Sequence, residues 1–392
     1  MACTINIDTC EKFCGLSVSS KFLICGLPIR LDTYKSCSFG CRYCFANSRI
    51  VMDTAKSFAV ADVDSIKRRL DRVMSGNGNT SSLLDTLIAK RVTWHCGGMS
   101  DPFQPINAEL RITNKTIDVC NQYGIKILFS TKSDTVHDAN LIPSLHTFQL
   151  SVSNVDDRKD IEPFVPPIEK RVRFFHELKS MGFKVGIRIQ PFIPNVSSTK
   201  IVEVFRQADH FTIEGLKLVP QNHAQIKWVR ESLGIPLSAF MNKGLYNLDI
   251  AARHELYAPV IEKIKKITNA TYSISDNDMR KGDCYCCCGD SLVMNGATGI
   301  DTTAMRRKYG DSYGIADVQC EIDRIGIGDC VCKNLFASNR QQFGNTVNDF
   351  LAAKFRSRSA PCSPVFRPQF IQPTLFPSIK LQPNETCERS ME

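Results

Sequence analysis

Short strand-like segments alternate with longer helix-like segments from about residue 21 to residue 219, and this alternation restricts the fold more than any other feature. Apolar, strand-like segments are expected at 22–31, 91–95, 125–130, 146–152, 184–190 and 212–218. Apolar residues recur at helical spacing at 62–74, 108–123, 168–181 and 201–207. The alternation predicts a parallel sheet with helical crossovers. Six units fall short of the eight that close a full barrel, so we expect an α/β fold, a partial (β/α)6 TIM-like barrel that is open. Reactive side chains should lie at the carboxyl ends of its strands.

The rest of the chain differs in composition from this core. We expect an N-terminal extension over 1–20 and the partial barrel over 21–222. A Cys-rich C-terminal extension follows over 223–355, with helix-like segments at 256–267 and 342–355. The tail over 356–392 is rich in Ser and Pro, a composition that favours disorder.

The composition is that of a soluble protein with a basic balance. Hydrophobic residues make up 43% and charged residues 23%, and the formal net charge is +9. A basic chain suits a polyanionic partner such as DNA or RNA, although the short basic runs also read as the solvated faces of helices. No apolar run approaches the roughly 20 residues that span a bilayer, and the first residues do not resemble a secretion signal. We therefore expect a cytoplasmic protein with no membrane partner.

Cysteine is unusually abundant, with 18 residues in the chain. In a reducing compartment, dense cysteine more often binds metal than forms disulfides. Seven thiols of the C-terminal region are enough for one four-ligand site, which would hold an auxiliary iron–sulfur cluster or a structural zinc, unless the thiols stay unligated. These residues are Cys284, Cys286, Cys287, Cys288, Cys320, Cys330 and Cys332.

A second group of cysteines has the spacing C-x3-C-x2-C and follows the first predicted strand. Cys37, Cys41 and Cys44 can hold three irons of a [4Fe–4S] cluster and leave the fourth iron open to a further ligand. Gly40 lets the loop turn tightly, and Tyr43 offers an aromatic face beside that ligand. The alternative is a zinc knuckle that recruits a fourth ligand from elsewhere.

Polar and glycine-rich motifs follow the next three strands. Gly97 and Gly98 allow a ligand to approach the backbone closely, and Ser100 and Asp101 can accept hydrogen bonds from an ammonium group. Lys132, after the third strand, can pair with a carboxylate. Ser151 and Ser153 follow on the fourth strand. Each motif taken alone also fits ordinary loop chemistry, such as a helix cap.

The three-cysteine loop, with an aromatic residue before its last cysteine, resembles the signature of the radical S-adenosylmethionine (SAM) superfamily. Taken in order, the motifs from Cys37 to Val219 resemble its spore photoproduct lyase-like family, also described as DNA repair photolyase-like. They include Glu162-Pro163, Arg171 with Gly182 after it, and the run Pro191-Phe192-Ile193-Pro194.

The resemblance implies a radical SAM barrel in which the open iron binds SAM. Reductive cleavage of SAM then gives methionine and a 5′-deoxyadenosyl radical, which abstracts a hydrogen atom from a substrate. By the same resemblance, Ser100 binds the amino group of SAM, and Lys132 with Ser151 or Ser153 binds its carboxylate. An electron donor such as flavodoxin or ferredoxin is implied as a partner.

One position departs from the lyase. The lyase has its hydrogen-donating cysteine two residues before the serine of the Ser-Asp pair, where this chain has Gly98. Cys96, two residues earlier, is the candidate catalytic thiol that remains.

Three functions follow from these motifs. The first is a radical SAM enzyme, a lyase or modifying enzyme, that repairs or modifies nucleic acid. The second is a radical SAM enzyme that acts on a peptide or small molecule with the help of an auxiliary cluster. The third is a non-catalytic protein that binds zinc and nucleic acid.

Overall fold

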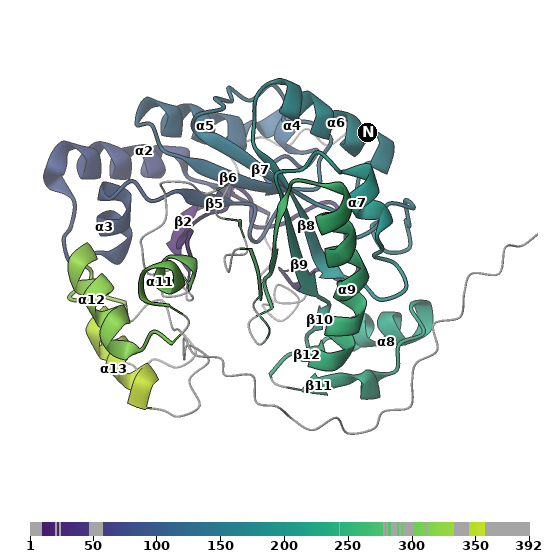
Figure 1. The fold of residues 1–392 in the computed structure, drawn as a ribbon. Helices are drawn as coiled ribbons and strands as arrows, with labels where there is room; N and C mark the ends of the chain where they lie inside the picture. Colours follow the sequence, from purple (N-terminus) through teal and green to yellow (C-terminus); the bar gives the residue numbers. More distant parts are fainter. Residues whose placement is uncertain are drawn as a thin grey trace, which may run out of the picture.

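A nine-stranded sheet forms the centre of the molecule (Figure 1). The computed structural model describes residues 10–19, 22, 25–46, 58–242, 244–276, 279, 281–283, 288–289, 292, 302–310, 312–332 and 345–356. Along the sheet the strand order is β14-β13-β9-β8-β7-β6-β5-β3-β2. The neighbouring strands from β3 to β13 in this order are parallel. Their bounds are β3 (Ile29–Leu31), β5 (Trp94–Cys96), β6 (Ile127–Thr131), β7 (His146–Ser151), β8 (Val185–Phe192), β9 (His210–Gly215) and β13 (Thr271–Ile274).

The two edges of the sheet are antiparallel strands, β2 (Leu16–Val18) beside β3 and β14 (Lys281–Gly282) beside β13. The sheet is large and is parallel at its centre, as expected. It differs from the expectation in its extent, because β13 is a seventh parallel strand. This strand lies in the part of the sequence that was expected to form a separate Cys-rich region.

Helices cover the outer face of the sheet (Figure 1). Helix α2 shows how the sequence defines them: Asp62 caps its first turn by accepting from the Ser65 amide, and Ile66 and Leu70 are buried. The helices along this face are α2 (Val63–Arg72), α3 (Leu83–Ala89), α4 (Asn107–Leu110), α5 (Ile112–Gln122), α6 (Ile168–Ser180), α7 (Lys200–Val204) and α9 (Ile250–Ile267). A π-helical turn, Val73–Asn77, extends α2, and a small parallel pair, β1 (Glu11–Phe13) with β4 (Ala59–Ala61), precedes it.

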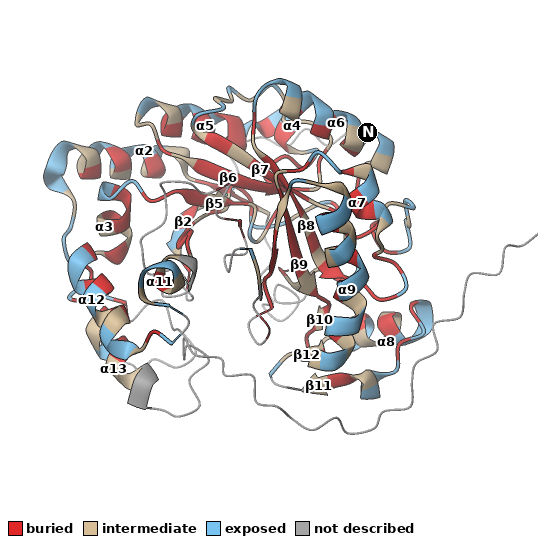
Figure 2. Cartoon of the chain, in the orientation of Figure 1, coloured by how far each residue is buried: buried red, intermediate tan, exposed pale blue. Residues whose placement is uncertain are grey.

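The strands have one apolar and one polar face. Trp94, Phe129, Phe148 and Ile187 are fully buried, and Phe148 contacts Phe174 of α6 at a ring-centroid distance of 6.4 Å. Side chains alternate between the two faces of a strand, so the residues between these positions point to the inner face of the curved sheet. Figure 2 shows the sheet as the most buried layer of the molecule. The apolar core thus lies between the sheet and its outer helices.

An insertion between β9 and α9 packs beneath the cysteine loop. It contains β10 (Lys217–Leu218), α8 (His223–Ser232), η3 (Leu237–Ala239), β11 (Phe240–Asn242) and β12 (Tyr246–Leu248), and its three strands form a small antiparallel sheet. Leu218, Val229 and Phe240 of the insertion share a hydrophobic cluster with Tyr43. The Gln225 amide also donates to the Tyr43 carbonyl at 3.1 Å. The insertion therefore supports one side of the cysteine loop.

The last helices lie beside α3, at the other end of the sheet (Figure 1). They are α11 (Thr302–Tyr309), α12 (Ile315–Ile325) and α13 (Val347–Arg356). The Val331 amide donates to the Ser81 carbonyl at 2.8 Å, and Phe350 contacts Phe22 at 5.8 Å between ring centroids. The region expected as one unit over 223–355 thus contributes to separate parts of the structure. In the described part of the chain, no helix is long and apolar enough to cross a membrane.

Candidate functional site

The three-cysteine loop leaves the carboxyl end of β3, where the sequence predicts it. Cys37, Cys41 and Cys44 are all partly exposed. The Cys44 amide closes a turn on the Cys41 carbonyl at 3.0 Å, and Gly40 has a φ of +64°, a conformation that favours glycine. The loop therefore brings three thiols to one end of the sheet.

Gln104, which follows the Ser100-Asp101 pair, binds the backbone at the start of this loop. Its buried side-chain amide accepts from the Ser38 amide at 2.8 Å and donates to the Ser36 carbonyl at 2.8 Å. Both contacts flank Cys37. The sequence reasoning did not single out Gln104, although its place between two prolines after the Ser-Asp pair is a local signal.

The three thiols of the loop form the candidate donor set. Burial raises the pKa of Cys37 to about 12 and also raises the pKa of Cys41, so a metal must displace protons to bind these thiols. Within the described residues, which include all three cysteines, no three His, Cys, Asp or Glu side chains are close enough to hold one metal ion. A zinc knuckle needs such a group, whereas each thiolate of a cubane binds a different iron. Three thiols in one loop are the donor set that such a cluster takes.

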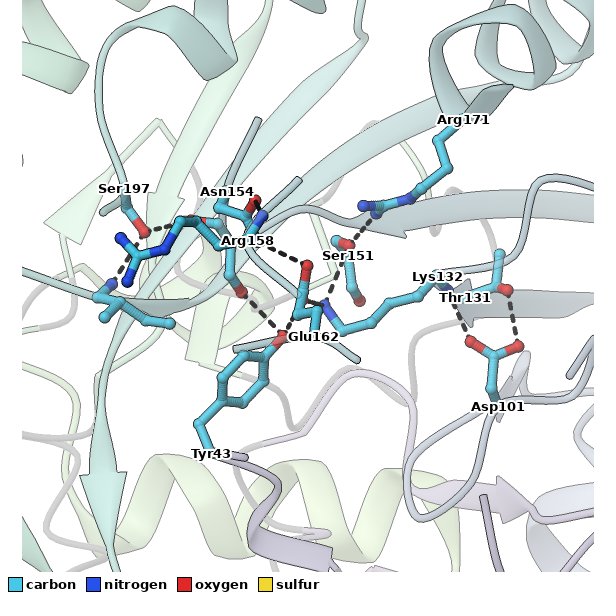
Figure 3. A network of polar contacts seen from close by, with 12 residues as sticks. Tyr43, Asp101, Thr131, Lys132, Ser151, Asn154, Arg158, Glu162, Arg171 and Ser197 are labelled. Atoms are coloured by element: carbon cyan, nitrogen blue, oxygen red, sulfur yellow. Dashed lines mark hydrogen bonds and ion pairs between the residues drawn. The ribbon is translucent and has the colours of Figure 1, made fainter. Parts of the chain in front are cut away.

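Tyr43 connects the cysteine loop to the loop after β7 (Figure 3). Its buried hydroxyl donates to the Glu162 carboxylate and accepts from Ser153 at 3.3 Å. Glu162 also forms an ion pair with Lys132 at 2.9 Å and accepts from Asn154 at 2.8 Å. The Lys132 ammonium lies 5.4 Å from the centroid of the Tyr43 ring. The aromatic residue predicted to flank the ligand therefore belongs to a buried polar network.

Two cations lie beside the carboxylate of Glu162 in this network. Burial alone would raise the pKa of Glu162, but Lys132, Arg171 and the Tyr43 hydroxyl outweigh burial, and the pKa lies below its ordinary value. Glu162 is thus ionised at neutral pH, beside two cations. Lys132 and Arg171 both donate to the Ser151 carbonyl, the former at 3.2 Å. These two donors could also bind an anionic ligand group.

Ser100 and Asp101 are buried next to this network, but their side chains contact the protein. The Ser100 hydroxyl donates to the Tyr34 carbonyl at 2.7 Å. The Asp101 carboxylate accepts from the Thr131 hydroxyl at 2.8 Å and from the amides of Lys132 and Phe103 at 2.6 and 3.0 Å. Burial raises the pKa of Asp101. Asp101 therefore joins the ends of β5 and β6.

The two glycines of this motif differ in their surroundings. Gly97 has a φ of +99°, and a Cβ atom there would lie 2.1 Å from the Ser130 carbonyl oxygen. A Cβ atom on Gly98 would lie 3.9 Å from the His95 ring, its nearest neighbour. Gly97 is thus required by the packing of β5 against β6, whereas Gly98 leaves space for a ligand.

The serines after β7 occupy different environments. Ser151 is partly exposed at the end of β7, beside the Lys132 ammonium. Ser153 is fully buried, and its hydroxyl is engaged by Tyr43. Of the two, Ser151 is the one that a ligand can reach.

The structure argues against the catalytic role expected for Cys96. This thiol is fully buried in the main hydrophobic core, and burial raises its pKa strongly. Its backbone pairs with Leu31 on one side and Phe129 on the other, both of which face the helices. Because side chains alternate along β5, His95 faces inward and Cys96 does not.

The C-terminal thiols do not form one group in the described part of the chain. Cys288 packs with Leu27 and Leu128, at the amino ends of the strands and opposite the cysteine loop. Cys330 and Cys332 are buried beside α3 and α13; Cys330 donates to the Thr80 carbonyl at 3.5 Å, and Cys332 donates to the Thr346 carbonyl at 2.9 Å. Cys320 is exposed on α12. Cys284, Cys286 and Cys287 lie outside the described residues, so a metal site in this region stays a prediction that depends on them.

A row of inward-facing polar residues was missed by the sequence reasoning. His95 on β5, Arg188 and Gln190 on β8 and Glu214 on β9 are partly exposed among buried apolar neighbours. Each stands between two apolar residues in its strand, and this alternation is the signal that would have identified them.

Comparisons with known proteins find distant similarities. No family model matches the chain. A curated relative, the uncharacterized protein MJ0683 of Methanocaldococcus jannaschii, is 24% identical over 183 residues, which cover 45% of this chain and 65% of that protein. The match thus spans less than two thirds of the relative's length.

Among solved structures, the chain resembles spore photoproduct lyase complexed with dinucleoside spore photoproduct, with a TM-score of 0.49, 14% identity and coverage of 63% of this chain and 76% of the lyase. It also resembles SuiB of Streptococcus suis bound to S-adenosylmethionine, with a TM-score of 0.43, 15% identity and coverage of 65% and 52%. The solved structures thus include the lyase whose family the motifs resemble. Both TM-scores lie below 0.5, and the function proposed below rests on the residues of this chain.

Proposed function

We propose that this protein is a radical SAM enzyme whose [4Fe–4S] cluster is bound by Cys37, Cys41 and Cys44. When bound there, the cluster supplies the electron that cleaves SAM into methionine and a 5′-deoxyadenosyl radical. The observation that carries the proposal is the link from the cysteine loop through Tyr43 and Glu162 to Lys132. It joins a three-thiol donor set to a cation-rich position at the same end of the sheet.

The charge balance of the network supports a binding position for SAM. Lys132 and Arg171 both donate to the Ser151 carbonyl, so the carboxylate of SAM is the group expected beside Lys132 and Ser151. Ser100 is the candidate partner of the SAM amino group, and its hydroxyl would exchange the Tyr34 carbonyl for that contact. Gly98, with its free space, would allow SAM to approach the backbone.

The substrate that we propose is nucleic acid, DNA or RNA, on which the enzyme would act in repair or base modification. The formal net charge of +9 supports a polyanionic partner. Arg42, exposed between two of the cysteines, adds a cation at the rim of the site. A flavodoxin or ferredoxin is the proposed electron donor, in the reducing environment of the cytoplasm.

The proposal is tested by the metal content and SAM cleavage of anaerobically purified protein. Reconstituted wild-type protein should bind iron and sulfide and form 5′-deoxyadenosine from SAM with dithionite. Changing Cys37, Cys41 and Cys44 together to alanine should abolish both properties, because the change removes all three thiols of the loop. Cys14→Ala, a change at an exposed cysteine outside the site, is the control. Formation of 5′-deoxyadenosine by the triple variant, or zinc in place of iron, would refute the proposal.

A further inference from the structure

Four polar side chains converge on the inner face of the sheet, separate from the network around Glu162. The Ser130 hydroxyl of β6 lies 2.8 Å from Nε2 of His95 on β5 and 3.4 Å from Nη1 of Arg188 on β8. It also contacts the Gln149 side-chain carbonyl of β7 at 3.4 Å. Four neighbouring strands thus contribute to one polar cluster.

The hydrogen bonds of this cluster leave it rich in donors. Arg188 can only donate, and Ser130 has one proton, which it gives to the Gln149 carbonyl. The Ser130 oxygen then accepts from Arg188 and from His95, which requires a proton on Nε2 of His95. A surface that presents N–H groups is complementary to an acceptor, such as the oxygen of an anion.

Arg188 forms no close ion pair in the part of the chain that the structure describes. No Asp or Glu of the described residues lies within 4.0 Å of its guanidinium, and its hydrogen bonds go to the neutral side chains of Ser130 and Gln190. The nearby Glu214 is paired with Lys217 and accepts from Ser275 at 2.9 Å. By contrast, the fully buried Arg253 lies 3.1 Å from Asp276. The charge of Arg188 acts on the carboxylate of Glu214, which Lys217 also pairs, but its hydrogen-bond partners are neutral. A half-buried guanidinium whose hydrogen bonds go to neutral groups can bind an anionic ligand.

The register of the sheet places this cation next to the proposed SAM position. Arg188 is the direct neighbour of Ser151 across the β7–β8 pair. We infer that Arg188, with Ser130 and His95, binds an oxyanion of the substrate, and that a phosphate of single-stranded nucleic acid supplies it. The inference rests on the proposed function and names the part of the substrate that the inner face of the sheet binds. The carboxylate of SAM has the same chemistry and is the rival source.

The test uses the full chain after anaerobic reconstitution. Binding of three probes is measured. Inorganic phosphate is followed by the shift in Tm, and a labelled ten-nucleotide single-stranded DNA by fluorescence anisotropy at fixed salt. SAM binding is measured by calorimetry. Arg188→Gln should weaken DNA binding by about 10-fold or more, the loss expected for a charge-assisted contact, and should remove the phosphate-induced rise in Tm. SAM affinity should stay within about twofold. Arg173→Gln, which removes an exposed arginine paired with Glu169 on α6, should leave all three unchanged.

Two results would overturn the inference. Unchanged binding of phosphate and DNA would remove Arg188 from any anion site, and loss of SAM binding alone would assign the guanidinium to the SAM carboxylate. If Arg188→Gln does not fold, Arg188→Lys is judged by the same criteria, since it keeps the charge and loses the forked donors. Phosphate binding that depends on Arg188 in a protein that forms no 5′-deoxyadenosine would reject the proposed function and keep the anion site.

Discussion

The Tyr43 hydroxyl donates a hydrogen bond to the buried carboxylate of Glu162, 119 residues further along the chain. Tyr43 stands between two of the proposed cluster ligands, and Glu162 is also paired with Lys132 at 2.9 Å. One carboxylate therefore connects the cysteine loop with the lysine proposed to bind SAM. Changes at Lys132 and at the loop can be separated by measuring SAM affinity and iron content independently.

Lys132→Ala should weaken SAM binding without loss of iron. The variant removes one of the two cations beside Glu162 and a charge-assisted contact of about 1.5–3 kcal/mol, which corresponds to roughly 10- to 100-fold in affinity. Lys132 favours the Cys41 thiolate through its charge, but it is not one of the three proposed ligands. Calorimetry with SAM and an iron assay measure the two effects. Lys67→Ala removes an exposed lysine paired with Asp71 at 2.9 Å and serves as the control. Wild-type SAM affinity in Lys132→Ala would exclude Lys132 from the site.

Gly97 and Gly98 should respond differently to the same change. Gly97→Ala adds a methyl group 2.1 Å from the Ser130 carbonyl oxygen, at a φ of +99°, so the ends of β5 and β6 must separate. We expect a loss of more than about 2 kcal/mol in the free energy of unfolding. Gly98→Ala meets nothing closer than 3.9 Å and should change the free energy of unfolding by less than about 0.5 kcal/mol. Urea denaturation of both variants provides the comparison, and equal stabilities would contradict the close approach at Gly97.

Gln104→Leu should reduce cluster loading more than it reduces stability. The change removes the two hydrogen bonds that hold the backbone on either side of Cys37, each of about 1 kcal/mol, while the side chain stays similar in size. Iron and sulfide per chain after reconstitution, compared with the Tm of the unloaded protein, separates the two effects. Gln122→Leu at an exposed position on α5 is the matched control. Full iron content in Gln104→Leu would show that the loop keeps its conformation without these two hydrogen bonds.

His146 should make the protein less stable in mild acid. Burial lowers its pKa to about 4, and its Nδ1 accepts from the Ile142 amide at 2.9 Å, which requires the neutral ring. The unfolded chain has an ordinary pKa near 6.5 and so binds a proton first. The stability from the neutral ring is complete above about pH 6.5 and is lost as pH falls toward the folded pKa.

Between pH 7 and pH 4 this linkage amounts to roughly 3 kcal/mol in the free energy of unfolding. Urea denaturation across this range should show a shallower decline for His146→Gln than for the wild type. His176→Gln, at an exposed position on α6, should follow the wild-type curve. Parallel curves for all three proteins would mean that His146 titrates normally in the folded state.

Much of the fold follows from local sequence patterns. The predicted segments at 146–152 and 168–181 correspond to β7 and α6 within a residue or two, because each has a strong apolar period. Strand β13 was not predicted as part of the sheet. It has four residues and is separated from its neighbour β9 by the insertion, so no local pattern reveals the pairing. Long-range pairing of a short strand is a tertiary effect.

The candidate site likewise has residues that local sequence patterns reveal and residues that only the tertiary structure brings together. The spacing of Cys37, Cys41 and Cys44 is local chemistry and could be read directly, and so could Lys132. The partner of Lys132 could not, because Glu162 reaches it from the loop after the next strand. Cys96 was chosen by its distance along the chain from the Ser-Asp pair. The alternation of strand faces instead turns His95 inward and leaves the Cys96 thiol in the core.

The separation of the sheet into an apolar outer face and a polar inner face has a consequence for how such a protein can change over evolution. Folding depends mainly on side chains such as Trp94 and Phe148, which pack against the helices. Replacing His95, Arg188 or Gln190 removes little apolar contact and costs little stability. A new ligand preference can therefore arise by a few substitutions on the inner face, while the apolar core and the cysteine loop stay unchanged.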